Sequence, residues 1–447
     1  MIKIGSKSGW KVVGMLAVCM ATGATRALAA QPIIPQNQRE FDASFTSMAP
    51  AQIDAAGHTF DNAAAKLFWF TDLEAAKKQA QREKKPILSL RMLGKLSDEY
   101  SCANSRFFRV IFYPQPQINR LLREKFVLHW SSERAVPVVT IDMGDGRVVK
   151  RTLTGNSAHY LLDANGRPLD VMPGVVTPAR FAKWLEGGAF LNREWNATEA
   201  AVRETFLSDW HRARMSELWH EVEPNRAKDE QWIATQIEKS LELNPIENAA
   251  PTRIPVEIAA PLAVGKSRGE APILDATRLF GSGARIAPVM LSSRSFFLAP
   301  NLGSDAQPSI LDEATKARIK AMNPPLASRA SVQNNGVFIG GNWTASAQIQ
   351  SISKVAPQTV DPFEVLIARF EGSILEDDRM SLARFQIPIH ASFIAGNADD
   401  FTTLNRKIYD RLFLTPKSDE WLGLSPDGAF TGLQNGGLFV EKTAPLE

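Results

Sequence analysis

The chain has 447 residues, of which 44% are hydrophobic and 22% are charged. This is the composition of an ordinary globular protein, and the length suffices for two or three domains. This composition excludes a low-complexity or fibrous chain. The two cysteines are too few for a disulfide-rich protein.

The first thirty residues differ in composition from the rest of the chain. Three lysines lead into the apolar run VVGMLAVCMATGA, and Ala27-Leu28-Ala29 then matches the small-x-small pattern of a signal-peptidase site. The run is short for a membrane span, and no stop-transfer segment follows it. We therefore expect a cleaved signal peptide at residues 1–29 and a periplasmic or secreted protein with no stable membrane span. An uncleaved anchor is the alternative.

Cleavage would change both the charge and the cysteine count. It removes four cations and no acids, so the formal net charge falls from +3 to −1. The mature chain then carries no excess of cations that would favour nucleic acid as a partner. Cys19 also leaves, and Cys102 becomes the only cysteine. A structural disulfide within such a mature chain is impossible, so the Cys102 thiol is expected either to be buried or to have a chemical function.

Residues 30–65 are rich in Gln, Pro, Ala and Asn with little periodicity, and we interpret them as a flexible lead-in. Thr71 and Glu74 have the spacing of a capping box, which predicts a helix from this point to about Lys85. Pro86 then precedes a short apolar strand, ILSL at residues 87–90.

The next elements alternate between helix and strand. PQINRLLREKF predicts a helix over 116–126, and FVLHW predicts a strand over 126–130. Two hairpins follow, because DG and NG pairs at 144–146 and 164–166 separate strand-like segments. Thr177-Pro178 then begins a helix, since proline is favoured at the first helical position. This order predicts an α/β layered domain at residues 66–188.

The remaining chain is mainly helical in pattern. Residues 189–243 predict a helical extension, broken near Pro224-Asn225. Residues 244–272 hold five prolines, and we interpret them as a linker and domain boundary. Residues 273–447 contain three helical patterns with a more β-like stretch between the first two, so we expect a separate, mainly helical C-terminal domain.

The segment from Phe68 to Glu186 resembles the thioredoxin-like superfamily in its order of features. An aromatic lead-in and helix, FWFTDLEAAKKQAQREKKP, precede the strand PILSL, and a cysteine motif at a helix start follows. HYLLDANGRPLDVMPG is similar to the family's final hairpin. The resemblance covers about a quarter of the chain. It implies a thioredoxin-like α/β fold and thiol–disulfide exchange with protein thiols or disulfides, without a cofactor.

In this family, function depends on Cys-x-x-Cys at a helix N-terminus. Unpaired backbone N–H groups and the helix dipole stabilise the reactive thiolate there. Cys102 matches the position of the nucleophile, but Ser105 occupies the position of the resolving cysteine. A serine can donate a hydrogen bond to the thiolate, yet it cannot close a disulfide. The resemblance therefore implies monothiol chemistry, either disulfide exchange through a mixed disulfide or sulfenic acid formation.

The family's cis-proline is also missing. The matching position is Ser157 or Ala158, where a cis bond would cost about 3 kcal/mol. His159 would lie beside this position and could face Cys102 as a base or as an ion-pair partner. The alternative is a strand histidine whose hydrogen bonds are satisfied by a neighbour. The long stretch 91–101 and the hairpin near residue 144 are further departures from the family.

Other interpretations remain open. Cys102 could be a small, buried and inert residue, and Ser105 a hydrogen-bonding residue at a helix start. His211, Glu217 and His220 share one helical stretch, but spacings of six and three residues do not make a metal-binding face, so we expect solvated positions. The competing function is a non-catalytic thioredoxin-fold scaffold for protein–protein interaction. Activity in the C-terminal domain is a third hypothesis, with no motif in its favour.

Overall fold

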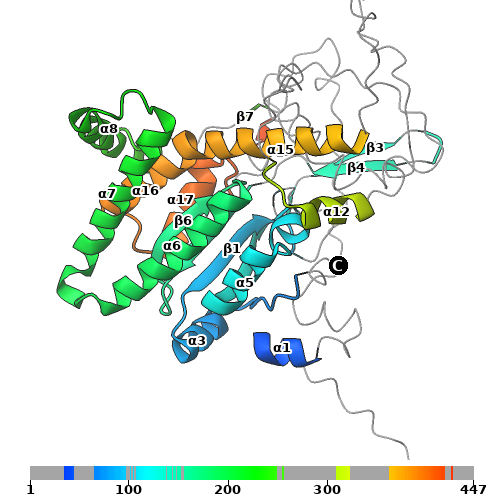
Figure 1. Ribbon diagram of the computed structural model, residues 1–447, viewed down its shortest axis with the longest axis horizontal. Helices are drawn as coiled ribbons and strands as arrows, with labels where there is room; N and C mark the ends of the chain where they lie inside the picture. Colours follow the sequence, from blue (N-terminus) through cyan, green and yellow to red (C-terminus); the bar gives the residue numbers. More distant parts are fainter. Residues whose placement is uncertain are drawn as a thin grey trace, which may run out of the picture.

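The computed structural model shows a mixed α/β protein, which confirms the predicted α/β class (Figure 1). The predicted signal peptide at 1–29 lies outside the described residues. Among the residues that are described, no helix is both long and apolar enough to cross a membrane. The structure describes residues 35–44, 65–96, 101, 104, 107–136, 138–142, 144–146, 148–152, 156–248, 254–255, 309–322, 362–417 and 424–425.

A four-stranded sheet forms the centre of the molecule. Strand β1 (Ile87–Leu93) pairs in parallel with β2 (Val127–Arg134) and antiparallel with β5 (Ser157–Leu162). Strand β6 (Pro168–Pro173) pairs antiparallel with β5, so the strand order is β2-β1-β5-β6. β5 and β6 are buried along their whole length, as expected for strands covered on both faces.

The sequence predicts most elements around this sheet. Helix α5 (Pro116–Lys125), the separate hairpin of β3 (Val138–Asp142) and β4 (Val148–Thr152), and the β5–β6 hairpin are confirmed. Helix α6 (Pro178–Ala197) begins where predicted, because the Thr177 hydroxyl accepts a hydrogen bond from Arg180 N. It continues past residue 188, the predicted end of the domain.

The start of helix α3 (Leu73–Glu83) differs from the prediction by one residue. Asp72, and not Thr71, is the N-cap: its carboxylate accepts a hydrogen bond of 2.7 Å from Ala75 N. An N-cap side chain must reach the N–H groups of the first turn, and a carboxylate also favours the positive end of the helix dipole. The helix ends at Lys84, whose left-handed conformation matches the predicted stop near Lys85.

The predicted flexible lead-in contains a packed helix, α1 (Gln38–Ser44). Its Phe41 is fully buried and lies 6.2 Å from the ring of Phe68. The Gln38 side chain also accepts a hydrogen bond from Phe68 N. Burial of the Phe41 ring thus holds in place a segment whose polar composition predicted no regular structure.

Helices α7 (Arg203–Val222) and α8 (Glu230–Glu242) follow α6 and are separated near Pro224, as predicted. Of the predicted linker, residues 244–248 and 254–255 are described, and Asn244 is buried and donates to Pro388 O at 3.1 Å. The predicted β-like stretch of the C-terminal part lies outside the described residues. The remaining elements are η3 (Phe108–Phe112), η4 (Ala200–Val202), α9 (Pro245–Asn248), β7 (Ile254–Pro255), α12 (Glu313–Met322), α15 (Pro362–Ser381), η6 (Leu382–Gln386), α16 (Ile387–Ile394), α17 (Phe401–Lys407), η7 (Ile408–Leu412) and β8 (Leu424–Ser425).

The described C-terminal helices pack into the same hydrophobic core as the sheet, so the expected separate domain is not confirmed. Phe370 of α15 lies 5.2 Å from the ring of Phe107, just before η3. On the sheet itself, Tyr160 lies 5.0 Å from Phe401 of α17. Figure 1 shows α16 and α17 beside α6 and α7 rather than apart from them. The core therefore unites segments that are more than 200 residues apart.

An ion pair joins α15 to the start of α6. Asp378 is buried and accepts hydrogen bonds from Arg180 Nε at 2.8 Å and from Thr177 N at 3.1 Å. Arg180 also pairs with Glu221 of α7 at 2.7 Å. One guanidinium therefore connects three helices.

We expect Asp378→Asn to lower the free energy of unfolding by about 3 kcal/mol, because it removes one partner of a buried charge pair. Urea unfolding followed by tryptophan fluorescence measures the loss. Glu238→Gln is the matched control, since its pair with Arg212 is exposed (67% for the Glu238 side chain) and should contribute less than about 1 kcal/mol. Equal effects of the two substitutions would contradict the structural role of Asp378.

Candidate functional site

Only two residues of the predicted thiol motif region belong to the described part of the structure. Cys102 and Ser105 are outside the described residues, but Ser101 and Asn104 are described and both are fully buried. Gly94, which follows β1, has φ +80°, and a Cβ atom there would lie 3.0 Å from Ser101 Cα. The residue before Cys102 therefore packs against the carboxyl end of β1, where the resemblance places the nucleophile.

Arg109 is a buried cation beside this segment that the sequence did not indicate. Its Nη2 donates to Ser101 Oγ at 2.9 Å, and its Nη1 donates to Leu96 O. The side chain thereby links η3 to both described ends of the segment between β1 and Cys102. The signal that could have identified it is a single arginine within the aromatic run FFRVIFY. A positive charge near a cysteine favours the thiolate form.

His159 lies on β5, opposite Leu90 of β1, and is fully buried. Its Nε2 is 2.7 Å from Tyr113 Oη, and its ring packs against Phe108 and Phe181 at 4.5 and 4.9 Å. Burial lowers the pKa of His159 to about 3, so the imidazole is neutral at neutral pH. Tyr113 Oη satisfies Nε2, whereas Nδ1 is buried without a hydrogen-bond partner among the described residues. The neutral ring favours the alternative of a strand histidine over an ion-pair partner.

A second group of titratable side chains meets at the interface between the sheet and the C-terminal helices. Asp170 comes from β6, His211 from α7 and His390 from α16, and all three are buried. One possible ligand atom from each lies within 4.8 Å of the other two. We did not identify this cluster from the sequence, because its members are separated by 41 and 179 residues and come together only through tertiary packing.

The expectation of a solvated His211 is wrong. The buried positions Leu207, His211, Met215 and Leu218 recur every three or four residues, and this face of α7 packs against α16. That apolar periodicity was the signal that could have placed His211 inside. Glu217 stays more than half exposed and pairs with Arg214, and His220 is exposed, as expected.

The hydrogen bonds of the two histidines determine their tautomers. His211 Nε2 lies 3.0 Å from Leu169 O, so it carries a proton. Burial lowers the pKa of His211 well below its usual range, which leaves a lone pair on its Nδ1. His390 Nδ1 lies 2.7 Å away and must donate to that lone pair. Burial, followed by the Arg214 charge, lowers the pKa of His390 to about 3, so His390 Nε2 has a lone pair too.

Asp170 is held by two donors. Its Oδ1 accepts a hydrogen bond of 2.7 Å from Val171 N, and its Oδ2 accepts one of 2.9 Å from Trp184 Nε1. Burial raises the pKa of Asp170 to about 6, although both hydrogen bonds and the Arg214 charge act in the opposite direction. Each carboxylate oxygen retains a second lone pair for a further contact.

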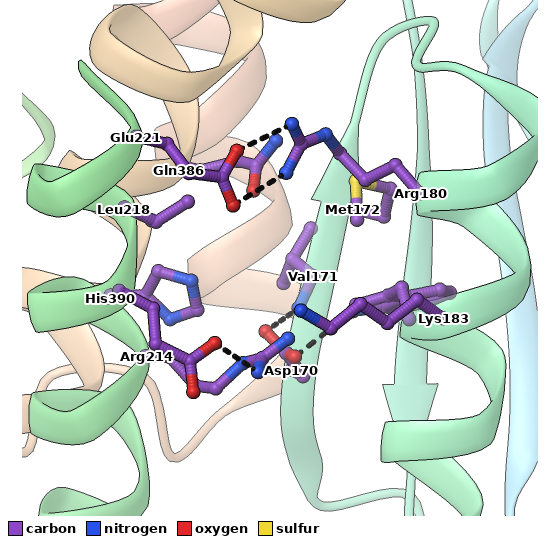
Figure 2. Close-up of a pocket in the computed structure, with 12 residues that line it drawn as sticks. Asp170, Val171, Met172, Arg180, Lys183, Arg214, Leu218, Glu221, Gln386 and His390 are labelled. Atoms are coloured by element: carbon purple, nitrogen blue, oxygen red, sulfur yellow. Dashed lines mark hydrogen bonds and ion pairs between the residues drawn. The ribbon is translucent and has the colours of Figure 1, made fainter. Parts of the chain in front are cut away.

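Asp170 and His390 open onto a pocket of about 470 Å³, a volume that includes solvent at its mouth (Figure 2). Charged side chains form its rim. Arg180 pairs with Glu221 at 2.7 Å, and Arg214 pairs with Glu217 at 2.6 Å. The carboxylate of Asp170 and the imidazole of His390, together with the His211 imidazole behind them, are the oxygen and nitrogen donors that divalent transition metals prefer.

Comparisons with known proteins add no family to these observations. No protein-family model matches the chain, and no match was found among curated proteins or among solved structures.

Proposed function

We propose that this is an exported protein with a thioredoxin-like domain in which Cys102 performs monothiol disulfide exchange. The observation that best supports the proposal is the sheet itself. The parallel strands β1 and β2, with α5 between them in the chain, are followed by the antiparallel β5–β6 hairpin and then by helix α6. All four strands belong to one sheet. This is the order of elements that the resemblance implies, and Cys102 lies between β1 and the helical segment, where the family activates a thiol.

The chemistry needs only one sulfur from this chain. The thiolate of Cys102 attacks one sulfur of a disulfide in an exported partner protein and forms a mixed disulfide, and the partner's other sulfur leaves as a thiolate. A partner thiol then attacks the mixed disulfide and restores Cys102. The partner's sulfurs are rearranged without net oxidation, so no cofactor is required.

Neighbouring side chains have distinct roles in this proposal. Ser105 donates a hydrogen bond to the thiolate, and the buried guanidinium of Arg109 supplies the positive charge that lowers a thiol pKa. His159 is neutral, so its part is limited to holding Tyr113 Oη and η3 in position.

The alternative function is a non-catalytic scaffold for protein–protein interaction, and one observation favours it. Ser101 and Asn104, which flank Cys102 on either side, are fully buried, and Phe107 is covered by Phe370 of α15. A thiol sheltered in this way would be inert.

The rate of Cys102 alkylation against pH separates the two functions. We expect fast labelling of the native protein with an apparent pKa below the free-cysteine value of about 8.5. Arg109→Gln should raise that apparent pKa, because it removes the buried charge. Arg212→Gln, at an exposed position on α7, is the control and should leave it unchanged.

Labelling that occurs only after unfolding would end the thiol proposal and favour the scaffold. If labelling is fast, a mixed disulfide should form between the wild type and an exported protein, and Cys102→Ala should form none.

A further inference from the structure

Three buried side chains from distant parts of the sequence, Asp170, His211 and His390, converge beside the pocket. Two of them, Asp170 and His390, line it (Figure 2). Asp170, His211 and His390 are at most 5% exposed, and one possible ligand atom from each lies within 4.8 Å of the others. We propose that these three side chains bind one divalent transition-metal ion of the Zn²⁺ class. Two imidazoles and a carboxylate are a donor set that binds this ion in proteins.

Each of the three side chains can offer one ligand atom to an ion. His211 must bind through Nδ1, because its Nε2 donates to Leu169 O. His390 Nδ1 contacts only His211, and among the described residues His390 Nε2 has no hydrogen-bond partner, so Nε2 can take up the proton when Nδ1 binds the ion. Asp170 uses one lone pair of each oxygen for Val171 N and Trp184 Nε1, and the second lone pair of each remains.

The surroundings of the cluster resemble the outer shell of a metal site. A ligating histidine typically donates its other ring N–H to a carbonyl, as His211 does to Leu169 O. The His211 ring is also stacked on Phe393 with centroids 4.0 Å apart, which fixes its orientation. The carboxylate of Asp170 is oriented by the indole of Trp184. These contacts orient the imidazole of His211 and the carboxylate of Asp170 before an ion binds.

Binding requires a small rearrangement and no net loss of protons from the histidines. A tetrahedral ion about 2.1 Å from each ligand separates the ligand atoms by about 3.4 Å. The two Nδ1 atoms are 2.7 Å apart, so the ion replaces the proton that they share. That proton moves to Nε2 of His390, and the carboxylate of Asp170 advances towards the ion. The pocket side remains open for a water molecule as the fourth ligand.

The cations near the cluster are largely compensated. Arg214 is the nearest, and it pairs with Glu217 at 2.6 Å. Arg180 pairs with both Glu221 and Asp378. Lys183 also lines the pocket and forms no ion pair among the described residues, so it is the one cation of the lining whose charge is not offset by a carboxylate.

The test is a Zn²⁺ titration of the purified full chain in competition with a chromophoric chelator. We expect one Zn²⁺ per chain. His211→Asn, His390→Gln and Asp170→Asn should each weaken binding about 100-fold or more, because even outer-shell changes cost 10- to 100-fold.

Two controls make the result specific. His220→Gln removes an exposed histidine from the same helix and should bind Zn²⁺ as the wild type does. Cys102→Ser should also bind normally, which distinguishes this site from zinc held by the thiol of the proposed function. Failure of the thiol proposal would leave this result unchanged.

A measurement on the wild type alone covers the case in which a buried variant does not fold. X-ray absorption of the zinc-loaded protein should show nitrogen and oxygen ligands at about 2.0 to 2.1 Å, with imidazole scattering. A sulfur ligand, an absence of saturable binding, or binding that survives all three ligand substitutions would overturn the proposal.

Discussion

Lowering the pH from 7 to 4.5 should strongly destabilise the protein, because buried histidines that are neutral in the fold become charged when the chain unfolds. Two of them lie outside the Asp170 cluster. His129 of β2 is buried with its Nδ1 2.8 Å from Ser89 Oγ, and burial, followed by the Arg91 charge, lowers its pKa to about 3. His159 has its pKa lowered to about 3 by burial.

The sign follows from proton binding. An unfolded histidine titrates near pH 6.5, whereas these two stay neutral in the native state until about pH 3. Between these values the unfolded chain binds more protons, so the free energy of unfolding falls as the pH falls. Each histidine contributes up to about 1.4 kcal/mol per pH unit. The contribution is fully present above about pH 6.5 and is lost progressively below it.

His159→Phe tests this contribution at one position. Phenylalanine keeps a ring against Phe108 and Phe181 but cannot take up a proton. At pH 7 the variant should be less stable than the wild type by about 1 kcal/mol, because the bond to Tyr113 Oη is lost. Its stability should fall less steeply with acid, so the two curves should cross a little below about pH 6.

Urea unfolding at several pH values between 7 and 4.5 measures both slopes. His220→Gln, which removes an exposed imidazole, should follow the wild-type curve. Parallel curves for His159→Phe and the wild type would contradict the prediction.

The second large effect is expected at the contact between the C-terminal helices and the sheet domain. Phe370→Ala should lower the free energy of unfolding by about 3 to 5 kcal/mol, because it leaves a cavity in the core. The ring is fully buried and meets Phe107 edge to face. Since the shared core unites both parts, we expect one unfolding transition that shifts as a whole.

Phe190→Ala is the matched control, because that ring is 44% exposed on α6. It should cost much less than Phe370→Ala in the same thermal and urea unfolding experiments. Two separate transitions, with only one shifted by Phe370→Ala, would show instead that the C-terminal helices form an independent domain.

Local signals predicted the elements of the sheet domain well. Pro178 at a first helical position and the glycines of the two hairpins act through the backbone of a few neighbouring residues. Helix α16 was missed because IPIHASFI is apolar on every side, and a short apolar run has no periodicity that separates helix from strand.

The sequence by itself determined the hairpins and most helices of the sheet domain, and it places Cys102 after β1 along the chain, because these features depend on residues that are neighbours in the sequence. Only the tertiary structure decided that α15 to α17 join the core of the sheet and that Asp170, His211 and His390 meet. The physical reason is that contacts between residues as far as 179 positions apart depend on which apolar helix and sheet faces pack together. No pattern among neighbouring residues specifies which faces will pack.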